Sequence, residues 1–171
     1  GFRIFVPLFA LSLASFYNII PLNESWQWVG SSTAIIILGI ATIVEILAYL
    51  IPWLDNLLDT IAVPLAAIAG TAVMVATVSD LDPTITWALA IIAGGGTATA
   101  IKGSTSSARL ASTATTAGIA NPVISTVETG TSIIMSVLAI FIPILAIILV
   151  VFIGWMLFKV FKLFKPSKSK K

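Results

Sequence analysis

Two isolated acidic residues inside long apolar runs are the first candidates for chemistry. Glu45 is flanked by isoleucine, valine and leucine, and Glu128 opens another apolar segment. A charge at the centre of a bilayer costs about 2.5–3.5 kcal/mol on insertion scales, so we expect both side chains to turn inward. The basic residues outside the C-terminal tail are Arg3, Lys102 and Arg109. These five residues predict a polar centre, which is either proton- or ion-linked or a set of ion pairs that holds helices in register.

A second group of candidate residues is polar but uncharged. Hydroxyls and free backbone in a broken helix can line a hydrated path and hold ions at mid-membrane, whereas small residues four apart let helix backbones approach closely. Because residues 102–121 are too polar to face lipid, we expect that stretch to be buried or re-entrant. The pore and packing interpretations both stay open. They concern Gly94, Gly95, Gly96, Thr97, Thr99, Ser104 and Ser112.

Catalytic patterns are missing. The chain has no cysteine and no histidine, which removes disulfides, thiolate and imidazole chemistry and the commonest ligands of zinc and haem. Residues 102–104 run Lys-Gly-Ser, whereas a phosphate loop requires Gly-Lys-Ser. The pairs Asp55 with Asp59 and Asp80 with Asp82 lie where interfacial turns are expected, so we interpret them as solvated caps. The sequence therefore predicts no enzyme, no cofactor and no metal site.

The composition points to lipid. Of 171 residues, 58% are hydrophobic and 9% charged, whereas a soluble domain carries roughly 25% charged residues. Charges are separated by apolar intervals of about 20 residues, the length of a helix that crosses the hydrocarbon core. The alternation of a lipid-facing barrel strand is absent, so the segments are helices. Six of the nine basic residues lie between Lys159 and Lys171, which excludes a nucleic-acid surface on the body of the chain.

These intervals predict an all-α, polytopic transmembrane bundle of about six to seven helical elements. Prolines and polar turns set the boundaries, with a bend at Pro64 and a stop at Pro52. Pro143 divides the last long apolar stretch into two helices. The expected helices lie within 4–23, at 33–51, from about 60 to 79, at 84–101, 123–141 and 144–164, with 102–121 as the broken or re-entrant element.

We expect one transmembrane domain over 1–165, followed by a basic tail, 166–171, that stays in the cytoplasm under the positive-inside rule. An order of Arg, then Glu, then Ile-Pro recurs loosely, which suggests halves 1–82 and 83–165 related by an internal repeat. The side of the membrane that holds the N-terminus depends on whether 102–121 crosses or re-enters. Because the chain begins with Gly1 rather than Met, we expect further residues upstream.

Three segments carry a resemblance to a known family: Gly1 to Leu8, Val44 to Asp55, and the Gly- and Thr-rich Ala93 to Arg109. The chain resembles the domain-of-unknown-function 4126 family of bacterial integral membrane proteins over nearly its whole length. It departs from the expected pattern by lacking an N-terminal helix and by Thr129 after Glu128. The resemblance implies a helical fold and a multi-pass location in the bacterial inner membrane, and it supplies no activity or substrate.

Two functions from different classes follow. The leading hypothesis is a non-enzymatic transporter or channel-like protein for a small solute or ion, built around the polar centre. The alternative is a structural or accessory subunit that packs against a larger membrane complex. The expected partners are the lipid bilayer and either further copies of the chain or such a complex, with no nucleic acid.

Overall fold

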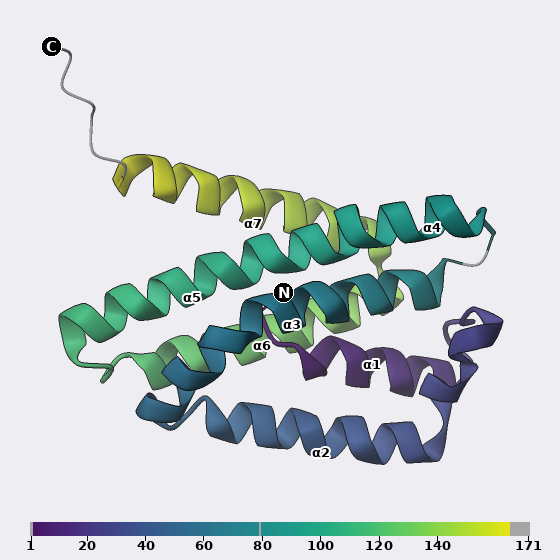
Figure 1. Cartoon of the computed structure of the whole chain (residues 1–171), viewed down its shortest axis with the longest axis horizontal. Coiled ribbons are helices and arrows are strands. Elements are labelled where there is room, and N and C mark those ends of the chain that lie inside the picture. Colours follow the sequence, from purple (N-terminus) through teal and green to yellow (C-terminus); the bar gives the residue numbers. More distant parts are fainter. Residues whose placement is uncertain (1, 79, 165–171) are drawn as a thin grey trace, which may run out of the picture.

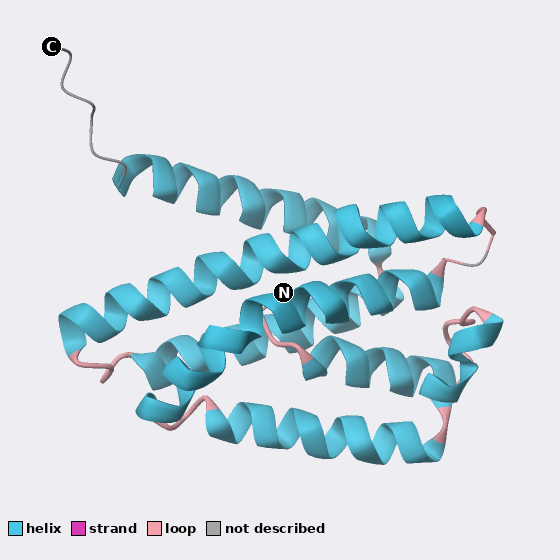
Figure 2. Cartoon of the chain, viewed as in Figure 1, coloured by secondary structure: helices cyan, strands magenta, loops and turns pink. Residues whose placement is uncertain are grey.

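All regular structure in the described part of the chain is helical. The computed structural model describes residues 2–78 and 80–164, and Figure 2 shows helices joined by short loops. The elements are α1 (Phe5–Phe16), η1 (Glu24–Gly30), α2 (Ser32–Ala48), α3 (Pro52–Thr77), α4 (Pro83–Leu89), η2 (Ala90–Gly95), α5 (Gly96–Thr116), α6 (Asn121–Phe141) and α7 (Pro143–Phe164). The predicted all-α class is confirmed. The tail predicted at 166–171 lies outside the described residues.

Most of the helices lie side by side along the long axis of the molecule (Figure 1). α1 packs against α2, α3 and α6, and the rod formed by α4, η2 and α5 packs along α3. α7 packs against α6. With 12 residues, α1 is only about 18 Å long, so it covers part of the bundle's length. The start of α1 consequently lies in the middle of the bundle (Figure 1).

Prolines and polar caps set the helix boundaries. Pro52, Pro83 and Pro143 each lie at the start of a helix, where the missing N–H breaks no hydrogen bond. The Ser31 hydroxyl accepts from the Ala34 amide at 3.1 Å, and the Asp82 carboxylate accepts from the Thr84 amide at 2.8 Å. The predicted stops at Pro52 and Pro143 are therefore confirmed, and Asp82 is the predicted exposed cap.

No break separates the helix predicted at 84–101 from the element predicted at 102–121. Residues Pro83–Thr116 form one continuous helical rod of 34 residues, in which Ala90–Gly95 is a π-helical segment. A Cβ on Gly70 would lie 2.4 Å from the Gly94 carbonyl oxygen, and a Cβ on Gly94 would lie 2.4 Å from that of Gly70. These glycines therefore bring the backbones of α3 and the rod together instead of breaking the rod.

The hydroxyl-rich half of this rod is the continuous helix α5, and much of it is exposed on the outside of the bundle. Several of its hydroxyls donate to carbonyls one turn earlier, for example Ser104 to Ala100 at 2.8 Å and Ser107 to Gly103 at 2.8 Å. A hydroxyl bonded in this way leaves no free donor facing outward. The prediction that residues 102–121 are buried is wrong for the exposed positions of this helix, and the prediction that they re-enter the membrane stays a prediction.

Within the described residues, three helical stretches are long and apolar enough to cross a membrane: Trp53–Thr77, Pro83–Thr116 and Asn121–Phe141. A fourth crossing results if η1 and α2, which meet at 64°, form one bent span. α1 and the segment Pro143–Met156 are apolar but shorter. These helices indicate a membrane protein. The number of crossings, their orientation and the internal repeat stay predictions.

Candidate functional site

The largest fully buried side chains of the described residues are mostly polar or charged. They are Arg3, Arg109, Tyr49, Lys102, Asn121, Asp55, Ser12 and Ser125. Glu45, Asp59 and Glu128 are buried as well. Apart from Ser12, these residues form one connected group, which we call the polar centre. The apolar core around it is built largely from alanine, so large ionic side chains occupy the interior of this bundle.

The residues of the polar centre come from five parts of the chain, and those that share a helix are spaced so that they lie on one face. Arg3 precedes α1, and Glu45 lies in the last turn of α2. Asp55 and Asp59 lie one turn apart at the start of α3, and Lys102 and Arg109 lie two turns apart on α5. The contribution of α6 follows the same spacing and comprises Asn121, Ser125 and Glu128.

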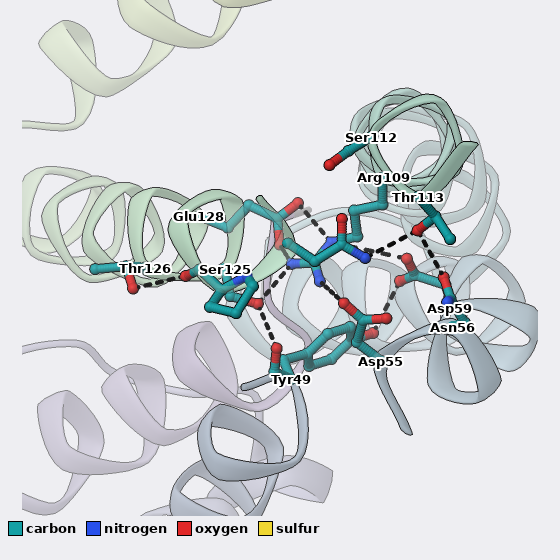
Figure 3. Close-up of polar contacts among 12 residues, drawn as sticks. Tyr49, Asp55, Asn56, Asp59, Arg109, Ser112, Thr113, Ser125, Thr126 and Glu128 are labelled. Carbon is teal, nitrogen blue, oxygen red and sulfur yellow. Dashed lines mark hydrogen bonds and ion pairs between the residues drawn. The ribbon is translucent and has the colours of Figure 1, made fainter. Parts of the chain in front are cut away.

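Arg109 is the hub of the ion pairs (Figure 3). Its Nε donates to Glu128 Oε1 at 3.3 Å, and its Nη2 donates to Glu128 Oε2. Nη1 donates to Asp55 Oδ2 at 3.2 Å, and Nε lies 3.7 Å from Asp59 Oδ2. Nη2 also donates to the Ser125 hydroxyl at 3.1 Å. One guanidinium therefore ties α5 to α3 and to α6.

Tyr49, which follows α2, is a platform for three cations. The guanidinium carbons of Arg3 and Arg109 lie 4.2 and 4.6 Å from its ring centroid, and Lys102 Nζ lies 4.6 Å from it. Such contacts are worth about 2 kcal/mol when desolvated. Burial and the nearby carboxylates of Asp59 and Glu45 raise the pKa of the Tyr49 hydroxyl above its usual range. The hydroxyl therefore keeps its proton and donates to Asp59 Oδ1 at 3.2 Å.

Glu45 does not pair with a cation and instead caps α1. Its two carboxylate oxygens accept from the backbone amides of Ile4 and Phe5 at 2.9 and 3.0 Å. A carboxylate is favoured there because the helix N-terminus carries about half a positive charge. Arg3, beside it, donates to the Ser125 carbonyl at 2.9 Å and to the Thr129 hydroxyl at 3.0 Å. The carboxylate of α2 thus fixes where α1 begins.

All five predicted charged residues lie in the polar centre, and their functional role stays a prediction. The interpretation of Asp55 and Asp59 as solvated caps is wrong, because Asp55 is 0% and Asp59 9% exposed and both face cations. The spacing of four between them was the available signal, since it puts both on one helix face. Tyr49, Asn121 and Ser125 carry no pattern that marks them in the sequence.

The predicted pore or packing residues separate into two groups. Gly94 and Gly95 pack against α3, where added Cβ atoms would lie 2.4 Å from the Gly70 carbonyl oxygen and 2.6 Å from the Thr71 hydroxyl. The remaining five are at least partly exposed, and none is in the polar centre. They are Gly96, Thr97, Thr99, Ser104 and Ser112.

Comparison with known families matches residues 1–162 to a family described as a domain of unknown function (DUF4126). The chain belongs to the DUF4126 family. No curated protein and no solved structure is similar to it. The match covers every member of the polar centre, so the centre lies within the family domain.

Two cavities of this DUF4126 chain reach the polar centre. One, of about 340 Å³, lies among α1, α3, the rod, α6 and α7, and Arg3 is the one charged residue among the described residues that line it. Thr97, Ser132 and Ser136 add hydroxyls to an otherwise mainly apolar wall. The other, of about 310 Å³, lies among α1, α2 and α3 and is lined by Glu45 and Tyr49.

The side chains of the polar centre in this DUF4126 chain are suited to electrostatic binding and to proton exchange. Within the described residues no group of acidic side chains has the arrangement of a metal site. Arg109 and Lys102 occupy the space between the carboxylates and would repel a metal cation. The arrangement can hold or release protons and can present cations to a solute.

Proposed function

We propose that this protein is a non-enzymatic transporter or channel-like protein for a small solute or ion, organised around the polar centre. One observation carries the proposal: two cavities in an apolar bundle meet buried charged residues, Arg3 in the first and Glu45 in the second. Ligand pockets of membrane proteins commonly lie where helices of a bundle meet and place a few polar groups in an apolar wall.

The lining of the larger cavity favours one class of solute. A cavity of about 340 Å³ is roughly twice the engineered cavity of about 150 Å³ that binds benzene. Its mainly apolar wall and few polar groups suit a small, largely apolar solute with one polar end. Short-chain monocarboxylates and apolar amino acids have this form.

The test is flux into vesicles that contain the purified protein, with a pH-sensitive dye for protons and radiolabelled monocarboxylates, amino acids and alkali cations as solutes. We expect Glu45→Gln and Glu128→Gln to abolish flux, with the exposed Glu24→Gln as their control. Ala139→Phe, which fills the larger cavity, should also block flux. Val137→Phe, on the opposite side of α6 and outside the lining, should not.

Two outcomes contradict the proposal. The first is that vesicles with wild-type protein are no more permeable than empty vesicles to protons and to every solute tested. The second is that both glutamine variants carry each solute at the wild-type rate.

The second candidate function, an accessory subunit of a membrane complex, is favoured by the outer face of α5. Ser104, Ala108 and Ser112 follow one another at a spacing of four on this helix, and all three are at least partly exposed. Small residues on such a face allow close helix approach. Ser104→Leu with Ala108→Leu should then dissociate an assembly that purifies in mild detergent, while the exposed Ile134→Phe leaves it intact. A monodisperse single chain from native membranes contradicts this function.

A further inference from the structure

The larger cavity meets charge of one sign. Its charged residue is Arg3, and no acidic residue is among the described residues that line it. Arg3 is 1% exposed and, unlike Lys102 and Arg109, forms none of the ion pairs of the described residues. Its Nε donates to the Thr129 hydroxyl at 3.0 Å and its Nη2 to the Ser125 carbonyl at 2.9 Å, whereas its Nη1 is buried without a partner. The guanidinium therefore has an unused donor at this wall.

The hydroxyls of α6 supply a second and independent observation. Ser132 is 5% exposed and lines the cavity, and its hydroxyl has no hydrogen-bond partner within the described residues. Ser136, one turn further along the helix, also lines the cavity, and its hydroxyl is unbonded within the same part of the chain. The other serines and threonines of α6 each donate to a carbonyl oxygen, namely Ser125, Thr126, Thr129 and Thr131. The unused hydroxyls of this helix are thus those at the cavity.

These donors lie at one end of the cavity. Thr129, Ser132 and Ser136 follow one another at spacings of three and four, so they share one face of α6. Because Arg3 binds Thr129, the Ser132 hydroxyl lies about one helical turn from the guanidinium. The cavity continues along α6 to Ala139, which lies about 10 Å beyond Ser132 at the standard helical rise.

The rest of the wall is apolar and built largely from small residues. Ala93 and Gly94 belong to the π-helical segment, and π-helical turns occur frequently at functional sites. A cavity with donors at one end and small apolar side chains beyond them has room for an unbranched apolar chain with an acceptor at its end. The small residues that α3 and the rod contribute are Ala66, Ala69, Gly70, Ala93, Gly94 and Ala98.

We propose that the larger cavity binds a monocarboxylate anion, with its carboxylate at Arg3 and Ser132 and its alkyl chain extending along α6 toward Ala139. Hydrogen bonds between a guanidinium and a carboxylate are charge-assisted and are among the strongest in proteins. An amino acid fits less well, because its ammonium group would find no acidic partner among the described lining residues. The inference rests on the proposed function, since it names the solute of that site.

Two carboxylates of the polar centre oppose the bound anion. Glu128 and Glu45 lie near enough to interact with Arg3 through space. Their direct contacts are elsewhere, since Glu128 accepts from Arg109 and Glu45 accepts from the two amides at the start of α1. They lower the affinity for an anion without occupying the Nη1 group of Arg3.

Binding of radiolabelled octanoate to vesicles that contain the protein tests the proposal, with protein-free vesicles of the same lipid as background. Unlabelled hexanoate should compete. Octanol, which has no charge, and octylamine and leucine, which bring an ammonium group, should compete far less.

Ser132→Ala should raise the dissociation constant for octanoate about tenfold, the effect of one hydrogen bond to a charged acceptor. Its unfolding midpoint should not fall, because the hydroxyl binds nothing within the described residues. Thr126→Ala, on the exposed side of α6 and outside the lining, is the matched control. Arg3→Gln should remove the preference for octanoate over octanol. Because Arg3 also binds α6, the competition series and Ser132→Ala carry the test if that variant does not fold.

The carboxylate on an alkyl chain has two sources, which the competitors distinguish. Competition by hexanoate indicates a solute from water, and competition by palmitate alone indicates a fatty acid from the bilayer. The proposal is overturned if octanol or leucine displaces octanoate as well as unlabelled octanoate does, or if Ser132→Ala binds octanoate like the wild type.

Binding at equilibrium is measured without transport, so the two proposals fail separately. Octanoate binding without flux of any solute contradicts the transport proposal alone. Flux of another solute without octanoate binding contradicts the monocarboxylate site alone.

Discussion

Arg109 and Glu128 bind each other through two parallel contacts across the interface of α5 and α6, Nε to Oε1 at 3.3 Å and Nη2 to Oε2. This fork joins helices that are connected by a tight turn in which Ala117 and Gly118 have positive φ. Because Arg109 also reaches Asp55 on α3, the pair holds three helices in one register.

Removal of the Arg109 side chain should destabilise the protein strongly. Arg109→Leu leaves buried carboxylates without their partner, which costs about 3–5 kcal/mol of unfolding free energy. Arg109→Lys should cost less but still be measurable, because an ammonium cannot form the fork. Denaturant unfolding in mixed micelles measures both, with the exposed Lys159→Met as control. Equal midpoints for Arg109→Leu and the control would show that the ion pairs do not hold the bundle.

Glu45→Gln should loosen the start of α1. A glutamine amide offers one acceptor oxygen where the carboxylate offers two, and it brings an N–H group toward another N–H. Loss of a helix cap costs about 0.5–2 kcal/mol. Hydrogen exchange at the Ile4 and Phe5 amides should accelerate, and Glu24→Gln, which is exposed in η1, should leave both rates unchanged. Unaltered protection in Glu45→Gln contradicts the capping role.

Glycines of the rod and of α6 should differ in their response to alanine. Gly94→Ala puts a methyl group against the Gly70 carbonyl and should lower the unfolding midpoint. Gly103→Ala and Gly130→Ala meet nothing within 4 Å and should be neutral or stabilising, by up to about 1 kcal/mol from helix propensity. Thermal unfolding of the three variants side by side checks this order, and a reversed order refutes the close approach of α3 and the rod.

Tyr49 should act mainly through its ring. Tyr49→Phe removes one hydrogen bond to Asp59, a net loss of about 1.5–3 kcal/mol because the acceptor is charged. Tyr49→Leu removes the hydroxyl and the three cation contacts together, so its loss should be larger by several kcal/mol. Unfolding free energies of the two variants test the difference, and equal losses would mean that the cations gain nothing from the ring.

The membrane class and the charged candidates could be predicted from sequence because lipid penalises every isolated charge. Glu45 and Glu128 stand alone in apolar runs, and their inward orientation follows from that cost. The cost of a charge in lipid does not predict which partner each of these side chains binds. That Glu45 caps α1 while Glu128 binds Arg109 depends on how the helices pack.

Asp55 and Asp59 could not be placed in the same way. Two acids after a proline and a tryptophan have the sequence of a membrane interface. Their burial arises because α3 packs against α5, which brings Lys102 and Arg109 to face the two carboxylates. Arg109 lies 54 positions further along the chain than Asp55, and no local pattern records that contact.

The hydroxyls of α5 change what this helix offers to its surroundings. Ser104 and Ser107 direct their hydrogens back along their own helix, toward carbonyls that already serve the backbone. The surface that these two serines present outward is mostly carbon and hydrogen, although the residue names suggest water. A count of serines and threonines therefore overstates the polarity of the outer surface of α5.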